Sequence, residues 1–411
     1  MHGKLFAATL LSVCLFASSG AAQNTTNSHP LTLKNFQPQK QITITKDMLG
    51  AIAAQGSSGA TLPVWNYQVV SSRDNSLYDG VIVGANPADR ANASVTVPAQ
   101  LVPIILKTHR IATSVNFTTG AIKTKAGDTT FDPTAVDTCL TAPNNVPVTL
   151  MRQSPVLSDA SFSVGGTSMG TTQYVDAFQR ANFWSVINRQ DYHVRLSPRV
   201  LDPIVVDVPA ANGLAVYPGI FSNTCAPFGI VDINLIDFVA TSAIAQLASK
   251  GVNPKTFPMF MLYNAAMSEG SPTNLFNCCA GGYHSINPAG PLTFQTYSPF
   301  DFDTTGVFGV GTEDTGIVSH EAAEWMNDPY VINPTPAWGH TGQVAGCQNN
   351  LEVGDPLTGN EFPRIVMKNG YTYHLQELAF FSWFYGAPSL AVHGWYSDNG
   401  TFLTDAGPVC K

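Results

Sequence analysis

The chain has 411 residues, a formal net charge of −8 at pH 7, and 12% charged residues where an average soluble protein has about 25%. No segment concentrates lysine and arginine, which argues against a nucleic-acid partner and against binding to an anionic membrane surface. The many Gly and Pro residues, with Ser, Thr and Asn, indicate instead a β-rich, loop-rich exported protein.

The first 22 residues have the pattern of a signal peptide. Lys4 precedes an apolar run from Leu5 to Ala17, and small residues follow at 18–22. This run is too short to span a bilayer, and no later stretch reaches about 18 apolar residues, so we expect no retained membrane span. The sequence therefore predicts a secreted, extracellular or periplasmic protein.

The six cysteines after the signal peptide are predicted to form disulfides, because their number is even and an exported protein meets an oxidising compartment. The sequence does not choose among the pairings. The adjacent Cys278 and Cys279 are expected to bond to two different partners. The six residues are Cys139, Cys225, Cys278, Cys279, Cys347 and Cys410.

Three further segments follow the signal peptide. Residues 23–62 are rich in Asn, Thr, Gln, Ser and Gly and are expected to form a flexible leader or linker. Residues 63–215 are predicted to form a β-rich N-terminal domain, and residues 216–411 a second domain. Short strand-like runs separated by turn residues occur at 64–70, 80–83, 94–97 and 101–106.

The second domain starts with an amphipathic helix, from the N-cap Asp232 to Lys250. Residues 257–263, FPMFMLY, are a continuous apolar run of strand length. Strands are also expected at 282–286 and 295–297. The predicted order is therefore helix, strands, and then the segment that carries the chemistry.

That segment is 312–329, TEDTGIVSHEAAEWMNDP, which is predicted to be a helix with Thr312 as its N-cap. His320 and Glu324 are four positions apart, so both side chains leave the same face, and Glu321 lies one step around the cylinder. We expect the apolar face of this helix to be buried and the opposite face to carry the ligands. The apolar face consists of Val318, Ala322, Trp325 and Met326.

The pattern H-E-x-x-E predicts a metal site. In H-E-x-x-H metallopeptidases two histidines bind zinc and the glutamate between them activates the bound water. Here Glu324 replaces the second histidine, Glu321 is the candidate general base, and a third ligand is expected from LEVGDP, as either Glu352 or Asp355. We expect one Zn²⁺ ion.

The extra carboxylate has two expected consequences. It cancels more of the ion's charge, which should raise the pKa of bound water and weaken hydrolysis. It also makes the donor set harder, so that another divalent ion such as Mn²⁺, Fe²⁺ or Ca²⁺ becomes acceptable.

Other histidines are less informative. His284, in GGYHS, either hydrogen-bonds a developing oxyanion as a catalytic residue or simply lies in a loop. His374 and Glu377 are near each other in HLQEL, but the aromatic run that follows predicts a packed core. No nucleophile elbow, P-loop or dinucleotide fingerprint occurs, which excludes serine-hydrolase and nucleotide chemistry.

The segment SHEAAEWMNDP resembles the zincin-type H-E-x-x-E proteins, and most of all the secreted Exordium-like (phosphate-induced) group. Ala337-Trp338, the stretch 352–355 and the stretch 282–284 fit the pattern of that group, and the match covers the second half of the chain. The resemblance implies an α+β fold: a zincin-like C-terminal domain with a backing helix, a mixed sheet whose edge strand holds an extended peptide, and an active helix. It implies His320, Glu324 and either Glu352 or Asp355 as ligands, and Glu321 as the base.

Two functions follow as hypotheses. The first is a secreted zinc-dependent peptidase that acts on a peptide or protein. The second is a non-catalytic extracellular or cell-surface binding protein that retains the zincin scaffold. A third interpretation is that His320, Glu321 and Glu324 are solvated residues near a helix end, and it predicts no function.

Overall fold

The computed structural model of the protein describes residues 46–89, 93–140, 145–187, 190–221, 224–309, 311–404 and 406–410. The predicted signal peptide and the predicted leader up to residue 45 lie outside the described residues. The rest of the predicted leader is not an irregular linker, because residues 46–57 form a helix. Ile52 of this helix and Leu62 beyond it are buried in the same core as Val64, which explains why the segment is ordered.

The fold is α+β, as predicted, and the described residues form one large mixed sheet, four two-stranded sheets and short helices. The helices are α1 (Lys46–Ser57), α2 (Pro147–Gln153), α3 (Tyr174–Asn182), α4 (Trp184–Ile187), α5 (Ile233–Gln246), α6 (Gly316–Asn327) and α7 (Phe381–Tyr385), with 3-10 turns η1 (Leu247–Lys250), η2 (Leu275–Asn277), η3 (Asp355–Leu357) and η4 (Val392–Gly394). The strands are β1 (Val64–Val70), β2 (Leu77–Val83), β3 (Ser94–Val115), β4 (Ile122–Phe131), β5 (Ala160–Val164), β6 (Thr167–Thr172), β7 (His193–Val200), β8 (Ile204–Asp207), β9 (Gly213–Val216), β10 (Phe228–Asp232), β11 (Phe257–Tyr263), β12 (Ala265–Ser268), β13 (Cys278–Ala280), β14 (Ser285–Gly290), β15 (Thr293–Phe302), β16 (Pro334–Thr341), β17 (Val344–Asn350), β18 (Glu361–Val366) and β19 (Thr372–Gln376).

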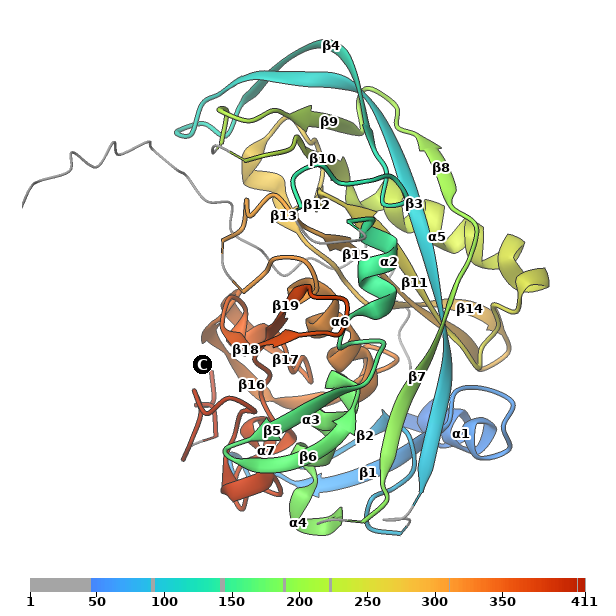
Figure 1. The fold of residues 1–411 in the computed structure, drawn as a ribbon. Coiled ribbons are helices and arrows are strands. Elements are labelled where there is room, and N and C mark those ends of the chain that lie inside the picture. Colours follow the sequence, from blue (N-terminus) through green and yellow to red (C-terminus); the bar gives the residue numbers. More distant parts are fainter. Residues whose placement is uncertain are drawn as a thin grey trace, which may run out of the picture.

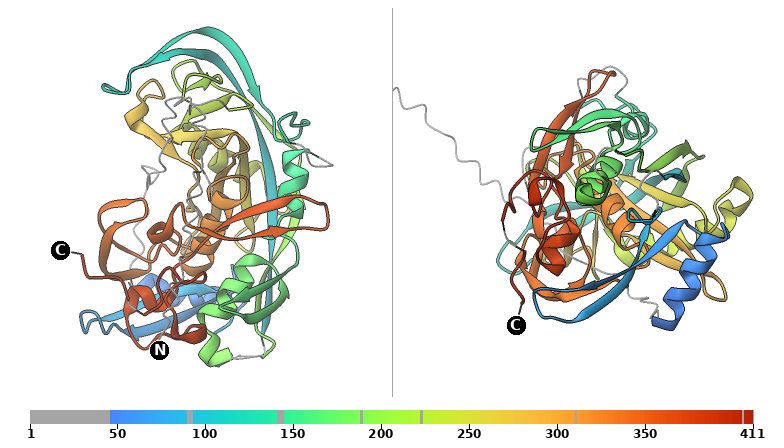
Figure 2. Two further views of the ribbon diagram at one scale, coloured as in Figure 1. Left: turned by 60° about the vertical axis from the view of Figure 1, so that its left-hand side comes forward. Right: turned by 90° about the horizontal axis from the view of Figure 1, so that it is seen from below.

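The large sheet has the strand order β13-β12-β10-β9-β3-β11-β15-β14. Its 22-residue strand β3 also pairs with β4, β7 and β8. The two predicted runs at 94–97 and 101–106 are parts of this single strand. β3 and β4 curl over one end of the molecule, while β1 and α1 lie at the other (Figure 2). β3 also pairs in parallel with β11, with Ala99 opposite Phe257. Strands from both sides of the predicted boundary at 215/216 therefore belong to one sheet.

Helices α5 and α6 cover opposite faces of this sheet (Figure 1). Met259 and Met261 of β11 share a core with Trp325 of α6, whereas Phe260, which alternates with them, shares a core with Ile236 of α5. Successive residues of a strand point to opposite faces, so the continuous apolar run of β11 reflects burial on both sides.

Helix α6 begins later than the sequence predicted, with Thr315 rather than Thr312 as its N-cap. Asp314 has a φ of 40°, a left-handed conformation that cannot continue a right-handed helix. Its carboxylate instead accepts hydrogen bonds from the backbone N–H of Thr315 and from the backbone N–H of His374. Burial is not confined to the predicted apolar face, because all 12 residues of α6 are buried, His320 and Glu324 included.

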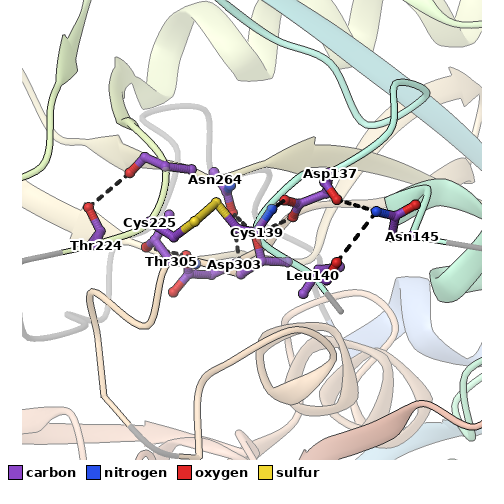
Figure 3. The surroundings of a disulfide bond; sticks show 11 residues. Asp137, Cys139, Leu140, Asn145, Thr224, Cys225, Asn264, Asp303 and Thr305 are labelled. Atoms are coloured by element: carbon purple, nitrogen blue, oxygen red, sulfur yellow. Dashed lines mark hydrogen bonds between the residues drawn. A yellow bond between two sulfur atoms is a disulfide. The ribbon is translucent and has the colours of Figure 1, made fainter. Parts of the chain in front are cut away.

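The six cysteines form disulfides, as predicted. Figure 3 shows the bond between Cys139 and Cys225, which joins the chain after β4 to the chain before β10, beside Asp137 and Asn264. The expectation that Cys278 and Cys279 have separate partners is wrong, because these two cysteines bond to each other. The remaining pair is Cys347–Cys410, and both long-range pairs have a Cα–Cα distance of 5.7 Å, within the usual range for a disulfide. Among the described helices, none has the length and apolar character needed to cross a bilayer.

Candidate metal centre

Three segments that are distant in sequence meet at the face of the sheet covered by α6. Helix α6 contributes three of the predicted residues, the connection between β13 and β14 contributes one, and the chain after β17 contributes two. The structure brings together all six predicted residues, which are His284, His320, Glu321, Glu324, Glu352 and Asp355.

His320 faces two carboxylates. Its Nε2 lies 3.0 Å from Oε1 of Glu324 and 3.4 Å from Oδ1 of Asp355. Its Nδ1 lies 3.0 Å from Oε1 of Gln376, whose Nε2 donates to the carbonyl of Gly354 at 2.7 Å. The hydrogen bond to Gly354 identifies the amide nitrogen of Gln376, so the atom that faces His320 is the amide oxygen. An amide oxygen can only accept, and Nδ1 of His320 must therefore donate. Nε2 is then the nitrogen available to a cation.

His284 approaches the other carboxylate oxygen of Glu324 and also faces Glu321. Its Nε2 lies 3.0 Å from the backbone carbonyl of Asp328, which can only accept, so Nε2 carries the hydrogen. Its Nδ1 lies 3.7 Å from Oε2 of Glu321 and 3.8 Å from Oε2 of Glu324. This is the usual arrangement of a metal-binding histidine, with one ring nitrogen held by an acceptor and the other directed at the site.

Two carboxylate oxygens in the centre are buried without a hydrogen-bond partner, namely Oε2 of Glu321 and Oε2 of Glu352. The two residues are 6% and 2% exposed. A buried unpaired carboxylate oxygen costs free energy, so its retention points to a cation or a water at that place.

Burial and mutual repulsion shift the titration of these groups. Burial raises the pKa of Glu324. Burial also raises the pKa of Glu352 well above its ordinary value, and the negative charges of Glu324 and Asp355 add to this shift. Burial also raises the pKa of Asp328 to about 6. Burial opposes charge on His320, but Glu324 and Asp355 outweigh it and raise the pKa of the imidazole.

Apart from the two imidazoles of the centre, the basic side chains of the described residues do not compensate the charges of the carboxylates. Within the ranges that the structure describes, no lysine or arginine forms an ion pair with Glu321, Glu324, Asp328 or Glu352. Imidazole and carboxylate donors without thiolate suit Zn²⁺, Mn²⁺ and related divalent ions. The donor set therefore fits the cation that the sequence predicted.

A glycine lets the backbone approach the candidate base. A Cβ on Gly282 would lie 2.8 Å from Cγ of Glu321, closer than a real Cβ contact allows. Glycine at 282 thus places the strand connection that carries His284 directly over α6.

The second glutamate–histidine pair in the sequence lies outside the centre. His374 donates from Nδ1 to Asp314, and Glu377 accepts hydrogen bonds from Ser397 and Thr401. Sequence reasoning missed Gln376, which lies between them and holds His320. No local pattern marks an amide as a partner of a distant histidine, so only the three-dimensional contact identifies it.

Comparisons of the chain with known protein families, with curated proteins and with solved structures found no match.

Proposed function

We propose that this centre binds a divalent metal ion, with Zn²⁺ as the first candidate, and that the protein is a metal-dependent hydrolase. The observation that carries the proposal is the buried Oε2 of Glu321, which has no hydrogen-bond partner among the described residues. Glu321 lies in one group with His320 and Glu324 on α6. Nε2 of His320, Oε1 of Glu324 and Oδ1 of Asp355 would hold the ion.

Glu352 and Asp355, which the sequence left as alternatives for the third ligand, lie beside different histidines. Asp355 lies beside His320, and its carboxylate accepts hydrogen bonds from the side chains of Gln343 and Gln348, which orient it. Glu352 belongs to the side of His284. Asp355 is therefore the better candidate for the third ligand of an ion at His320.

When bound, the cation would supply Lewis acidity that acidifies water and polarises a carbonyl group. Glu321 would accept the proton, since its Oε2 has no hydrogen-bond partner among the described residues. Glu324 is held in position because its Oε1 accepts hydrogen bonds from the backbone N–H groups of Gly354 and Asp355.

A peptide is the proposed substrate class. β14 is the last strand of the large sheet and pairs antiparallel with β15, which leaves its outer edge without a described strand partner. An extended peptide can add to such an edge through main-chain hydrogen bonds. β14 follows His284 directly, so the edge starts next to the centre. The resemblance to zincin-type proteins favours the same substrate class, and the predicted signal peptide with three disulfides favours export.

The second candidate is a non-catalytic extracellular binding protein in which the ion is structural. One observation favours it: His320, Glu324, Glu352 and Asp355 are each at most 5% exposed. An ion enclosed to this degree could stabilise the fold without meeting a substrate.

Metal content and peptide cleavage of the mature protein would separate these functions. We expect the wild type to contain the ion and to cleave a peptide. Glu321→Gln should retain the ion and lose about 10²–10⁴-fold in kcat, as expected for the loss of a general base. Glu324→Gln should lose both the ion and the activity. Glu269→Gln, which changes an exposed residue, should keep both. A metal-containing wild type without cleavage of any peptide would support the binding protein, and a metal-free protein would refute both candidates.

A further inference from the structure

The two carboxylate oxygens of Glu324 face two different histidines. Oε1 lies 3.0 Å from Nε2 of His320, and Oε2 lies 3.8 Å from Nδ1 of His284. A carboxylate that presents one oxygen to each of two ligand groups has the arrangement of a bridging ligand between two metal ions.

We propose that the centre holds a second divalent cation, bound by Nδ1 of His284, Oε2 of Glu324 and the carboxylate of Glu352. Glu324 then bridges the two ions. This inference rests on the proposed function, because the first ion is the one assigned there to His320, Glu324 and Asp355. It gives His284 the role of a ligand in place of the two alternatives that the sequence left open, an oxyanion contact or a position in a loop.

The three donors of the second site are already assembled. One donor atom each from His284, Glu324 and Glu352 lies within 4.8 Å of the other two, a spacing that a single ion between them can span. All three residues are buried. Because Nε2 of His284 donates its hydrogen to the carbonyl of Asp328, Nδ1 carries a free lone pair, which is directed towards Glu324 and Glu352.

Glu352 supplies a further, independent indication of a ligand. Its Oε1 accepts a hydrogen bond from Asn350 at 2.6 Å, while Oε2 is buried and has no partner. An ion at His320 would leave this second oxygen unsatisfied, because Glu352 belongs to the group around His284. A cation at the second site would satisfy it.

The charge of the centre agrees with two ions. A single ion of charge 2+ is balanced by Glu324 and Asp355, and Glu321 and Glu352 then remain as buried carboxylates with no described lysine or arginine paired to them. A second ion of the same charge would offset the negative charge of these two carboxylates in their ionised form. Sites with two metal ions about 3.5–4 Å apart are common in hydrolases, where both ions polarise the reacting oxygens.

Metal stoichiometry tests the proposal without relying on activity. The full-length mature protein is loaded with Mn²⁺, freed of excess ion by gel filtration, and measured by elemental analysis and by electron paramagnetic resonance. We expect two Mn²⁺ per chain and an exchange-coupled spectrum for the wild type. His284→Ala and Glu352→Gln should each retain one ion with an uncoupled spectrum. The matched controls His109→Gln and Glu361→Gln, which change residues outside the centre, should retain two.

Each result has a distinct meaning. One ion in the wild type, with an uncoupled spectrum, overturns the second site and leaves the proposed function standing. No ion in the wild type overturns both. Two ions retained in both His284→Ala and Glu352→Gln overturn the assignment of these ligands. Circular dichroism identifies a variant that does not fold, in which case the wild-type stoichiometry and spectrum still decide.

Discussion

Gly354 lies against the ring of His320 so closely that a Cβ at position 354 would be 2.5 Å from both Cγ and Nδ1 of the imidazole. Gly354 has a φ of −87°, which any residue can adopt, so the requirement for glycine is steric and not conformational. The LEVGDP segment can approach α6 only because this position has no side chain.

Gly354→Ala should therefore displace the ring of His320 and weaken metal binding. We expect a loss of about 10–100-fold in affinity, as for other changes that disturb the orientation of a ligand. Competition with a chelator of known affinity would measure it. The control is Gly346→Ala, because a Cβ on Gly346 would meet no atom within 4 Å. Equal affinities for both variants would contradict the prediction.

Gln376 should control which nitrogen of His320 is available to a cation. Gln376→Leu removes the acceptor of the Nδ1 hydrogen and should lower metal affinity by about 10–100-fold. Gln376→Glu keeps an acceptor at that place and should retain more affinity than the leucine variant. Isothermal titration of both variants with Zn²⁺ would provide the comparison, and the opposite order of affinities would refute this role.

Trp325 anchors α6 to the sheet. Its ring stacks on Phe257 with centroids 3.9 Å apart, and its Nε1 donates to Oγ1 of Thr296 at 2.9 Å. Trp325→Ala should lower the free energy of unfolding by about 3–5 kcal/mol, because it leaves a large cavity in the core. Phe238→Ala, at a side chain that is 67% exposed, should change it by less than about 0.5 kcal/mol. Urea unfolding curves at fixed metal content would test both values.

The His374–Asp314 contact predicts a pH dependence of stability. Burial lowers the pKa of His374, but the hydrogen bond to Asp314 and the charges of Asp314 and Glu313 outweigh burial and the opposing charge of Arg364, so the net shift is upward. Glu361 also faces the ring, 3.8 Å from Nε2. A raised pKa means that the folded state binds the proton more tightly. The stabilisation is therefore complete below the ordinary histidine pKa of about 6.5 and is lost as pH rises through the folded value.

We expect the difference in free energy of unfolding between the wild type and His374→Gln to be largest near pH 6 and below, and to shrink as the pH is raised. Chemical denaturation across this range, at constant metal content, would measure the difference. A constant or growing difference at higher pH would show that His374 is neutral in the folded protein. Phe238→Ala, which removes no titrating group, serves as the control and should give a difference that does not change with pH.

Local patterns in the sequence determined much of this protein. The spacing of His320, Glu321 and Glu324 places them on neighbouring positions of one helical turn, a relation that depends only on helix geometry. The apolar run at 257–263 predicted β11, and the N-cap Asp232 predicted the start of α5, where its side chain accepts a hydrogen bond from the N–H of Asn234. The even number of cysteines predicted disulfides as a class.

Only the tertiary structure decided which distant residues meet. The pairing of β3 with β11 across the predicted boundary at 215/216, the bond between Cys278 and Cys279, and the contact between Gln376 and His320 depend on sheet register and chain crossing. Hydrophobic periodicity encodes which face of a strand is buried but not which strand lies beside it. For the same reason the sequence could identify the H-E-x-x-E segment but not the approach of His284 to the second oxygen of Glu324, on which the second metal site depends.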